Sequence, residues 1–283
     1  MSTLLYLSPI HWDIDPRIFP SFEYLRWYGF SWAIGVYMAF LLMRYLYQKE
    51  GKAVESLDGL AIYLLIGGIL GARLGHILFY DLAYYMEHPI EILPFRLEPE
   101  FQFTGFQGLA SHGGIFGAML ALGLYSWRHR ENYLELIDRL VIVVVLLGGC
   151  IRLGNLMNSE IIGKPSSVPW AFVFSRVDDL PRHPAQLYEA LFYFGISILL
   201  FQLWRKPHLA ARRGFLFGLG LALIFIQRFI VEFFKADQVA FESDMVINMG
   251  QILSIPLILI GLIVLFKSKP KIPQTDAEDS SQS

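Results

Sequence analysis

The sequence predicts an all-α integral membrane protein with about seven transmembrane helices. Two observations support this fold class. Of the 283 residues, 55% are hydrophobic and only 17% are charged, whereas a soluble globular protein carries about 25% charged residues. The apolar residues also fall in long runs that do not alternate with polar residues, as the strands of a membrane β-barrel would.

Seven stretches are apolar enough to span a membrane. Crossing about 30 Å of hydrocarbon takes about 20 residues at helical rise. The stretches run over 27–47, 57–80, 112–127, 137–156, 186–204, 214–234 and 248–266. The third is short, which leaves room for a tilted or re-entrant element. No removable targeting segment precedes the first stretch, so we expect that stretch to act as the insertion signal.

Basic residues in the short connections predict the orientation. They follow the first, third, fifth and seventh stretches: Lys49, Lys52, Arg128, Arg130, Arg205, Lys206, Arg212, Arg213, Lys267, Lys269 and Lys271. All of these connections lie on one side, which the positive-inside rule assigns to the cytoplasm. The N-terminus is therefore expected outside and the C-terminus inside. We expect one transmembrane domain over 1–272, outer-face loops at 81–111 and 157–185, and a disordered tail at 273–283.

Charge and cysteine content exclude two classes of protein. The net charge of −2 gives no general attraction to nucleic acid. The single cysteine, Cys150, rules out an internal disulfide framework.

Ionisable residues inside the stretches recur at one depth. Such residues are costly in a membrane and normally face a cavity or a partner. Counted from the cytoplasmic ends at helical rise, Arg152 and Arg228 lie about 20 Å up, and His112 and Glu189 lie about 22 Å up. Glu232 is one turn above Arg228. Several stretches therefore place their least tolerable residues in one layer, in the outer half of the bilayer.

Individually, these residues also have structural explanations. Arg228 and Glu232 have the spacing of a buried ion pair on one helix. Arg73 is expected to snorkel to the outer interface from its helix end rather than to take part in catalysis. His112 precedes two glycines and could be a packing or capping residue. Their shared depth is what favours a site.

Two arginines at one depth indicate an anionic ligand. A guanidinium matches phosphate oxygens and keeps its charge, and the phosphate most available in an outer leaflet is a lipid headgroup. A phosphate clamp with an imidazole and carboxylates is equipped for group transfer. An anion or lipid-headgroup transporter is the alternative. The inner halves of three stretches are almost entirely Leu, Ile, Val and Phe, which favours a site open to the outer leaflet.

A series of short motifs follows in order along nearly the whole chain. They are RWYG at 26–29, GARLG at 71–75, SHGG at 111–114, GCIRLGN at 149–155, RHPAQLYE at 182–189, RFIVEF at 228–233 and NMGQ at 248–251. Together they closely resemble those of the bacterial phosphatidylglycerol–prolipoprotein diacylglyceryl transferases. The chain departs from the family pattern over 105–111 and at Ile224, where a tyrosine is expected.

This resemblance implies a reaction. The diacylglyceryl group of phosphatidylglycerol would move to the thiol of the lipobox cysteine of a prolipoprotein, forming a thioether and releasing glycerol phosphate. The nucleophile would be the substrate's cysteine and not Cys150. Arg152 and Arg228 would hold and neutralise the departing phosphate. His112 would be the general base for the thiol, although a lipid phosphate or a carboxylate is an alternative proton acceptor.

The resemblance also implies the binding residues and partners. Asn155, Glu160 and Gly163 would shape the headgroup site, Glu232 would orient the second arginine, and Tyr28 would contact the headgroup. No metal or cofactor is implied. The expected partners are phosphatidylglycerol, prolipoprotein signal peptides with a lipobox cysteine, and membrane lipids, without nucleic acid. The expected location is the bacterial cytoplasmic (inner) membrane, with the active site toward the outer leaflet.

Overall fold

The computed structural model describes residues 9–21, 24–93, 95–96, 101–103, 108–236 and 247–270. Within it the chain forms two compact units, 1–46 with 137–283, and 47–136. We describe each unit by itself, and the single transmembrane domain over 1–272 stays a prediction. The tail predicted to be disordered at 273–283 lies outside the described residues.

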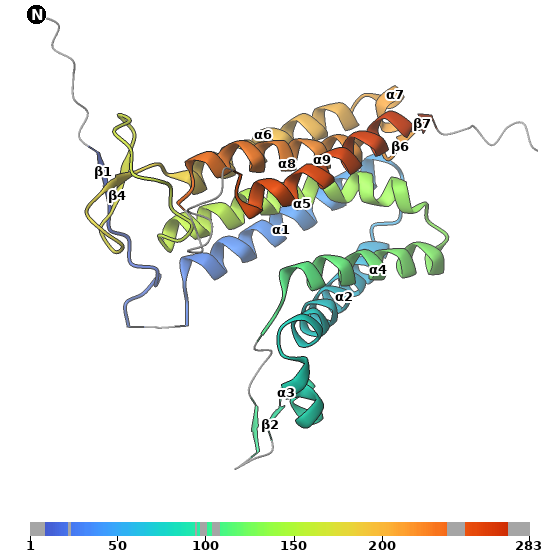
Figure 1. Cartoon of the computed structure of the whole chain (residues 1–283). Coiled ribbons are helices and arrows are strands. Elements are labelled where there is room, and N and C mark those ends of the chain that lie inside the picture. Colours follow the sequence, from blue (N-terminus) through green and yellow to red (C-terminus); the bar gives the residue numbers. More distant parts are fainter. Residues whose placement is uncertain are drawn as a thin grey trace, which may run out of the picture. The chain divides into compact units, whose positions relative to one another are not determined.

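The larger unit is a bundle of long helices (Figure 1). Its helices are α1 (Trp27–Lys49), α5 (Tyr133–Met157), α6 (Ala185–Trp204), α7 (Pro207–Ala210), α8 (Phe215–Val231) continued by η2 (Glu232–Phe234), and α9 (Met249–Lys267). A helix satisfies every backbone polar group within its own segment, which is what a long apolar run in lipid requires.

Small residues bring these helices close together. A Cβ on Gly35 of α1 would lie 2.7 Å from Leu147 and 2.8 Å from Cys150 of α5. A Cβ on Gly218 of α8 would lie 2.8 Å from the carbonyl oxygen of Gly261 on α9. Both contacts are possible only without a side chain. Cys150 is a free, buried cysteine that fills space between α1 and α5.

A small sheet lies at one end of this bundle. Strand β1 (Ile10–Trp12) pairs in parallel with β4 (Phe172–Phe174), which pairs antiparallel with β5 (Pro181–Arg182). Phe172 and Phe174 are buried with Leu156, and the indole Nε1 of Trp12 donates to the carbonyl oxygen of Leu156 at 3.0 Å. The sheet is thereby fixed to the last turn of α5. At the opposite end, β6 (Arg212–Arg213) pairs with β7 (Lys269–Pro270).

The smaller unit is built on a tight helix pair. Its elements are α2 (Ser56–Phe79), α3 (Leu82–Glu87), η1 (Pro89–Ile92), β2 (Phe95–Arg96), β3 (Gln102–Phe103) and α4 (Ser111–His129). A Cβ on Gly71 would lie 2.4 Å from the carbonyl oxygen of Gly113, so α2 and α4 touch backbone to backbone. A largely apolar groove of about 990 Å³ runs along this pair, and His112 is among its lining residues.

Arg73 has a structural place in the smaller unit. It is only 6% exposed, so it does not snorkel to solvent as we expected. Its Nε donates to the carbonyl oxygen of Ile92 at 3.0 Å, a terminal nitrogen donates to that of Glu91, and the guanidinium lies 4.8 Å from the ring centre of Tyr85. Arg73 thus ties η1 and α3 to α2.

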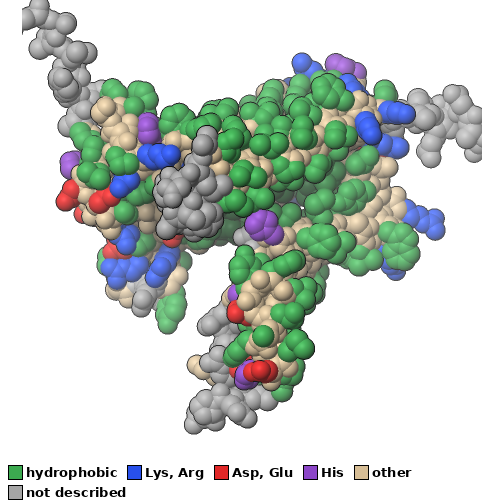
Figure 2. All heavy atoms as spheres, in the orientation of Figure 1, with side chains coloured by type: hydrophobic (Ala, Val, Ile, Leu, Met, Phe, Trp, Pro, Cys, Tyr) green, Lys and Arg blue, Asp and Glu red, His purple; other side chains and the backbone are tan. Residues whose placement is uncertain are grey.

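The described helices agree with a polytopic membrane protein. Six are long and apolar enough to cross a membrane: α1, α2, α5, α6, α8 with η2, and α9. The third predicted stretch forms α4, a helix of 19 residues that is not among these six. Hydrophobic side chains cover the visible face of the larger bundle, with lysines and arginines gathered at its ends (Figure 2).

Candidate functional site

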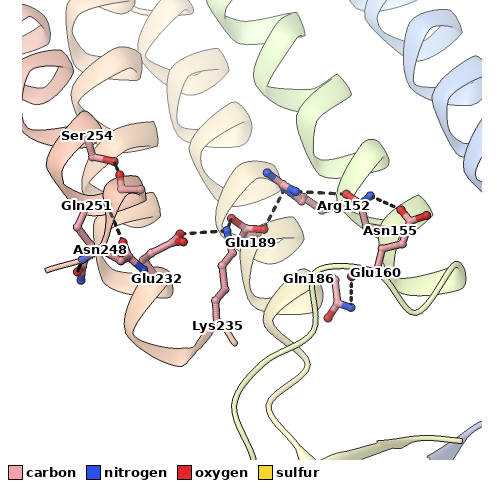
Figure 3. Close-up of polar contacts among 11 residues, drawn as sticks. Arg152, Asn155, Glu160, Gln186, Glu189, Glu232, Lys235, Asn248, Gln251 and Ser254 are labelled. Atoms are coloured by element: carbon pink, nitrogen blue, oxygen red, sulfur yellow. Dashed lines mark hydrogen bonds and ion pairs between the residues drawn. The ribbon is translucent and has the colours of Figure 1, made fainter. Parts of the chain in front are cut away.

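A partly buried arginine and a buried carboxylate form the centre of the site, where the last turns of α5 meet the first turns of α6 (Figure 3). The Nε of Arg152 lies 2.9 Å from Oε2 of Glu189, whose side chain is completely buried. Burying a carboxylate is costly unless it is paired, so this geometry fixes both helices. The sequence placed these two residues at one depth, and the structure brings them into contact.

A lysine forms an ion pair with the second oxygen of the Glu189 carboxylate. The Nζ of Lys235 lies 2.8 Å from Oε1 of Glu189 and 3.2 Å from Oε2 of Glu232. Its side chain is 3% exposed. We did not predict a role for Lys235, because it follows the last apolar residue of its stretch, where a lysine normally reaches out to water. Its spacing of three residues from Glu232 was the available signal.

We call these four residues the charge network: Arg152, Glu189, Lys235 and Glu232. The motif at 248–251 begins α9 beside it. The side chain of Asn248 accepts from the backbone N–H of Gln251 at 3.0 Å, and the Gln251 side chain accepts from that of Asn248 at 3.1 Å. Gly250 packs against Glu232, since a Cβ there would lie 2.8 Å from the carboxyl carbon.

Arg228 lies on α8 as the cation outside the network. Tyr193 on α6 has both Arg152 and Arg228 among its charged neighbours, which places the two arginines in one region of the bundle. Within the described part of the chain, the Arg228 side chain has no hydrogen bond or ion pair, and Glu232 pairs with Lys235 instead. The expected orienting of Arg228 by Glu232 is therefore not seen. Because the network holds two cations and two carboxylates, Arg228 adds an uncompensated positive charge.

Hydrogen bonds extend the site from Arg152 to the loop that follows α5. A terminal nitrogen of Arg152 donates to Oδ1 of Asn155 at 3.3 Å, and Nδ2 of Asn155 donates to Oε2 of Glu160 at 3.1 Å. Asn158 donates to the other oxygen of Glu160 at 3.0 Å. Asn155 is 5% exposed, whereas Glu160 is exposed. The asparagines thus hold an accessible carboxylate at the edge of the site.

The turn that carries Glu160 is strained. Ser159 and Ile161 both have φ of 56°, a region that non-glycine residues seldom adopt and β-branched ones almost never. The backbone N–H of Glu160 donates to the carbonyl oxygen of Asn155 at 3.0 Å, and the Gln186 side chain donates to that of Glu160. Backbone strain of this kind concentrates at ligand sites.

Gly163 lies where its own backbone packs against the backbone of His183 and of Phe234. Its N–H donates to the carbonyl oxygen of His183 at 3.0 Å. A Cβ here would lie 2.3 Å from that oxygen and 2.8 Å from the carbonyl oxygen of Phe234. Only glycine therefore allows the segment before α6 and the segment after α8 to meet. Arg182 also donates to the carbonyl oxygen of Gly163, at 3.2 Å.

His183 belongs to a small aromatic cluster beside this backbone contact. Its Nδ1 lies 3.0 Å from the Tyr188 hydroxyl, which accepts from the indole of Trp170 at 2.7 Å. Its ring lies 5.1 Å from that of Phe234. Burial lowers the pKa of His183 below its ordinary value, so the neutral ring is favoured.

The remaining predicted residues are Tyr28 and His112. Tyr28 lies on α1 and packs against Gly154 of α5, the residue before Asn155. A Cβ on Gly154 would lie 3.1 Å from the Tyr28 ring. His112 is exposed on the first turn of α4 in the smaller unit. In that unit we also find a pair we did not predict, His76 with Asp81, joined at 3.1 Å from Nε2 to the carboxylate.

The helices and this site define an integral membrane protein with a buried arginine–carboxylate site suited to an anion. The family model described as prolipoprotein diacylglyceryl transferase matches residues 17–267. The chain therefore belongs to the prolipoprotein diacylglyceryl transferase family.

Similar proteins span almost the same length. A relative from Bacteroides fragilis is 46% identical over 264 residues, covering 92% of this chain and 95% of its own. One from Tolumonas auensis is 45% identical over 261 residues, covering 92% and 97%. One from Chloroherpeton thalassium is 40% identical over 276 residues, covering 97% and 98%. Each is named phosphatidylglycerol–prolipoprotein diacylglyceryl transferase.

Proposed function

We propose that this protein transfers the diacylglyceryl group of phosphatidylglycerol to the thiol of the lipobox cysteine of prolipoproteins, the first step of lipoprotein maturation. The observation that carries the proposal is the pairing of a neutral charge network with one uncompensated arginine. Such a site offers an incoming phosphate one guanidinium that no carboxylate of the described residues pairs with. Family membership supplies the substrates, since the relatives are named for both of them.

Arg152 and Arg228 bind the phosphate in this proposal. Arg228 has all five of its N–H donors available among the described residues, and Arg152 keeps terminal donors beyond those it gives to Glu189 and Asn155. The lipid phosphodiester carries one negative charge, and the released phosphomonoester carries up to two. Fixed guanidinium groups stabilise this added charge in the transition state more than in the ground state.

The bond changes are those of a substitution at carbon. The sulfur of the lipobox cysteine attacks the glycerol carbon that bears the phosphate ester, a carbon–sulfur bond forms, and the carbon–oxygen bond breaks. The phosphate oxygen takes the electron pair and leaves as glycerol phosphate. The thiol proton passes to His112, an imidazole being the side chain that exchanges protons near neutral pH. Glu160, Asn155 and Tyr28 contact the glycerol headgroup.

We place the protein in the bacterial inner membrane, with the N-terminus outside and the site toward the outer leaflet. The basic connections support this orientation.

A mass-shift assay tests the function. A lipobox peptide with phosphatidylglycerol should gain one diacylglyceryl group when the protein is added. Arg152→Ala and Arg228→Ala should abolish the gain while the variants still insert, and Arg205→Ala, at the other end of α6, should retain it. Full activity in both site variants would contradict the phosphate role. Anion flux in peptide-free proteoliposomes, without any mass gain, would favour a transporter instead.

A further inference from the structure

We infer that Lys235 and Glu189 are positioning residues for Arg152, and that Gly163 serves the same purpose through the backbone. The inference rests on the proposed function for its substrate. It concerns how the arginine is held rather than which residues bind the lipid.

The first step is the geometry of Glu189. Its two carboxylate oxygens bind different cations from different elements, with Lys235 on one and Arg152 on the other (Figure 3). A carboxylate held on one oxygen can rotate only about that contact. The other oxygen lies 2.9 Å from Nε of Arg152 as an ion pair, while a terminal nitrogen of this arginine donates to Asn155.

The second step is electrostatic. With Lys235 present, the negative charge of Glu189 is shared between two cations. Without Lys235, the whole charge of the buried carboxylate would act on Arg152, in surroundings where ion pairs are stronger than in water. Arg152 would then be a fully neutralised cation and a weaker ligand for phosphate. Lys235 thus keeps part of the arginine's charge available.

The third step is how Lys235 itself is placed. Its backbone forms a bridge with Gly163, and the flanking N–H of Lys164 donates to the carbonyl oxygen of Phe234 at 2.8 Å. A side chain on Gly163 would strike the carbonyl oxygen of Phe234, the residue before Lys235. Gly163 therefore acts at a distance from the ligand, by letting the lysine reach Glu189.

Three single variants and a control test this chain of contacts. Lys235→Met and Gly163→Ala should each raise the KM for phosphatidylglycerol by about tenfold or more, with a smaller change in kcat. Lys235→Arg, which keeps the charge, should bring KM back to within about threefold of the wild type. Lys164→Met is the matched control, because Lys164 is an exposed lysine next to Gly163, and its KM should not change.

Folding is separated from positioning by a second variant. Lys235→Met leaves two buried carboxylates, Glu189 and Glu232, short of one cation, which destabilises a protein. The double variant Lys235→Met/Glu189→Gln removes one of these two charges, so it should unfold at a higher temperature in detergent than the single variant. Its KM should stay raised, because nothing orients Arg152. A KM within about twofold of the wild type in Lys235→Met or in the double variant would overturn the inference.

Binding to detergent micelles that contain phosphatidylglycerol or phosphatidylcholine provides an independent readout. The wild type should prefer phosphatidylglycerol, and Lys235→Met should lose most of that preference. If the wild type binds phosphatidylglycerol but modifies no peptide, the proposed function fails and the positioning inference is still tested. If Lys235→Met binds phosphatidylglycerol as the wild type does, the positioning inference fails alone.

Discussion

The carboxylate of Asp138 caps the start of α8 through Gly214. Its Oδ2 accepts from the backbone N–H of Gly214 at 2.6 Å, and its Oδ1 accepts from that of Phe217 at 2.7 Å. Asp138 is 5% exposed and lies on α5, so one side chain satisfies two N–H groups at the start of a neighbouring helix.

Loss of this cap should destabilise the bundle. Asp138→Ala leaves one buried and one partly buried N–H group without an acceptor, which we expect to lower the free energy of unfolding by about 2–4 kcal/mol. Asp138→Asn, which keeps one acceptor, should cost less. Unfolding in detergent followed by circular dichroism measures both, with the exposed Asp179→Ala as control. Equal stability of Asp138→Ala and Asp179→Ala would contradict the capping role.

The contact between α2 and α4 makes a second prediction. Gly71→Ala places a methyl group against the backbone of Gly113 and should lower stability by about 1–3 kcal/mol. Gly68→Ala, on the same helix with no atom within 4 Å of the position that a Cβ would take, should be neutral or slightly stabilising. Thermal unfolding of the two variants compares them directly, and similar shifts in both would show that this close packing is not required.

Activity of His112 variants tests its proposed role as a base. If the imidazole takes the thiol proton, His112→Ala should lower kcat by about 10²–10⁴ with little change in the KM for phosphatidylglycerol. A loss below about tenfold would point to another proton acceptor, such as the departing phosphate.

The lowered pKa of His183 predicts a pH effect on stability. Its pKa in the folded protein lies below the ordinary value of 6.5, because burial disfavours the charged ring. The unfolded chain therefore binds a proton at higher pH than the folded one, so stability is full above 6.5 and falls as the pH drops toward the folded pKa. His183→Gln should show a smaller loss of Tm between pH 7.5 and 5.5. An identical loss in both proteins would contradict this prediction.

Much of the fold was predictable because a long apolar run in a membrane must satisfy its backbone hydrogen bonds within its own segment, as a helix does. The run at 27–47 became α1, and counting at helical rise brought Arg152 and Glu189 to one level. The β1-β4-β5 sheet was not predictable, because its strands are short and β1 is separated from its partner by most of the chain. Short strands carry too few residues for an alternating pattern to be recognised.

The site was predicted less completely than the helices. Depth counting assigns a level but not a partner, so Glu232 was matched with Arg228 on its own helix when its ion pair is with Lys235. Lys235 itself comes into the interior only because Gly163 pairs with it, and that pairing joins segments about 70 residues apart. Such contacts depend on tertiary packing, which no local pattern records.

The parallel pairing of β1 with β4 has a consequence for biosynthesis. Ile10–Trp12 leaves the ribosome before the first helix, yet its partner Phe172–Phe174 is made about 160 residues later. At a synthesis rate of about 5–20 residues per second, the interval between synthesis of β1 and of β4 is on the order of 10–30 s. The sheet packed on the end of α5 is thus completed only after the chain through β4 has been synthesised. A nascent chain halted before residue 172 would leave Trp12 and the end of α5 exposed to chaperones.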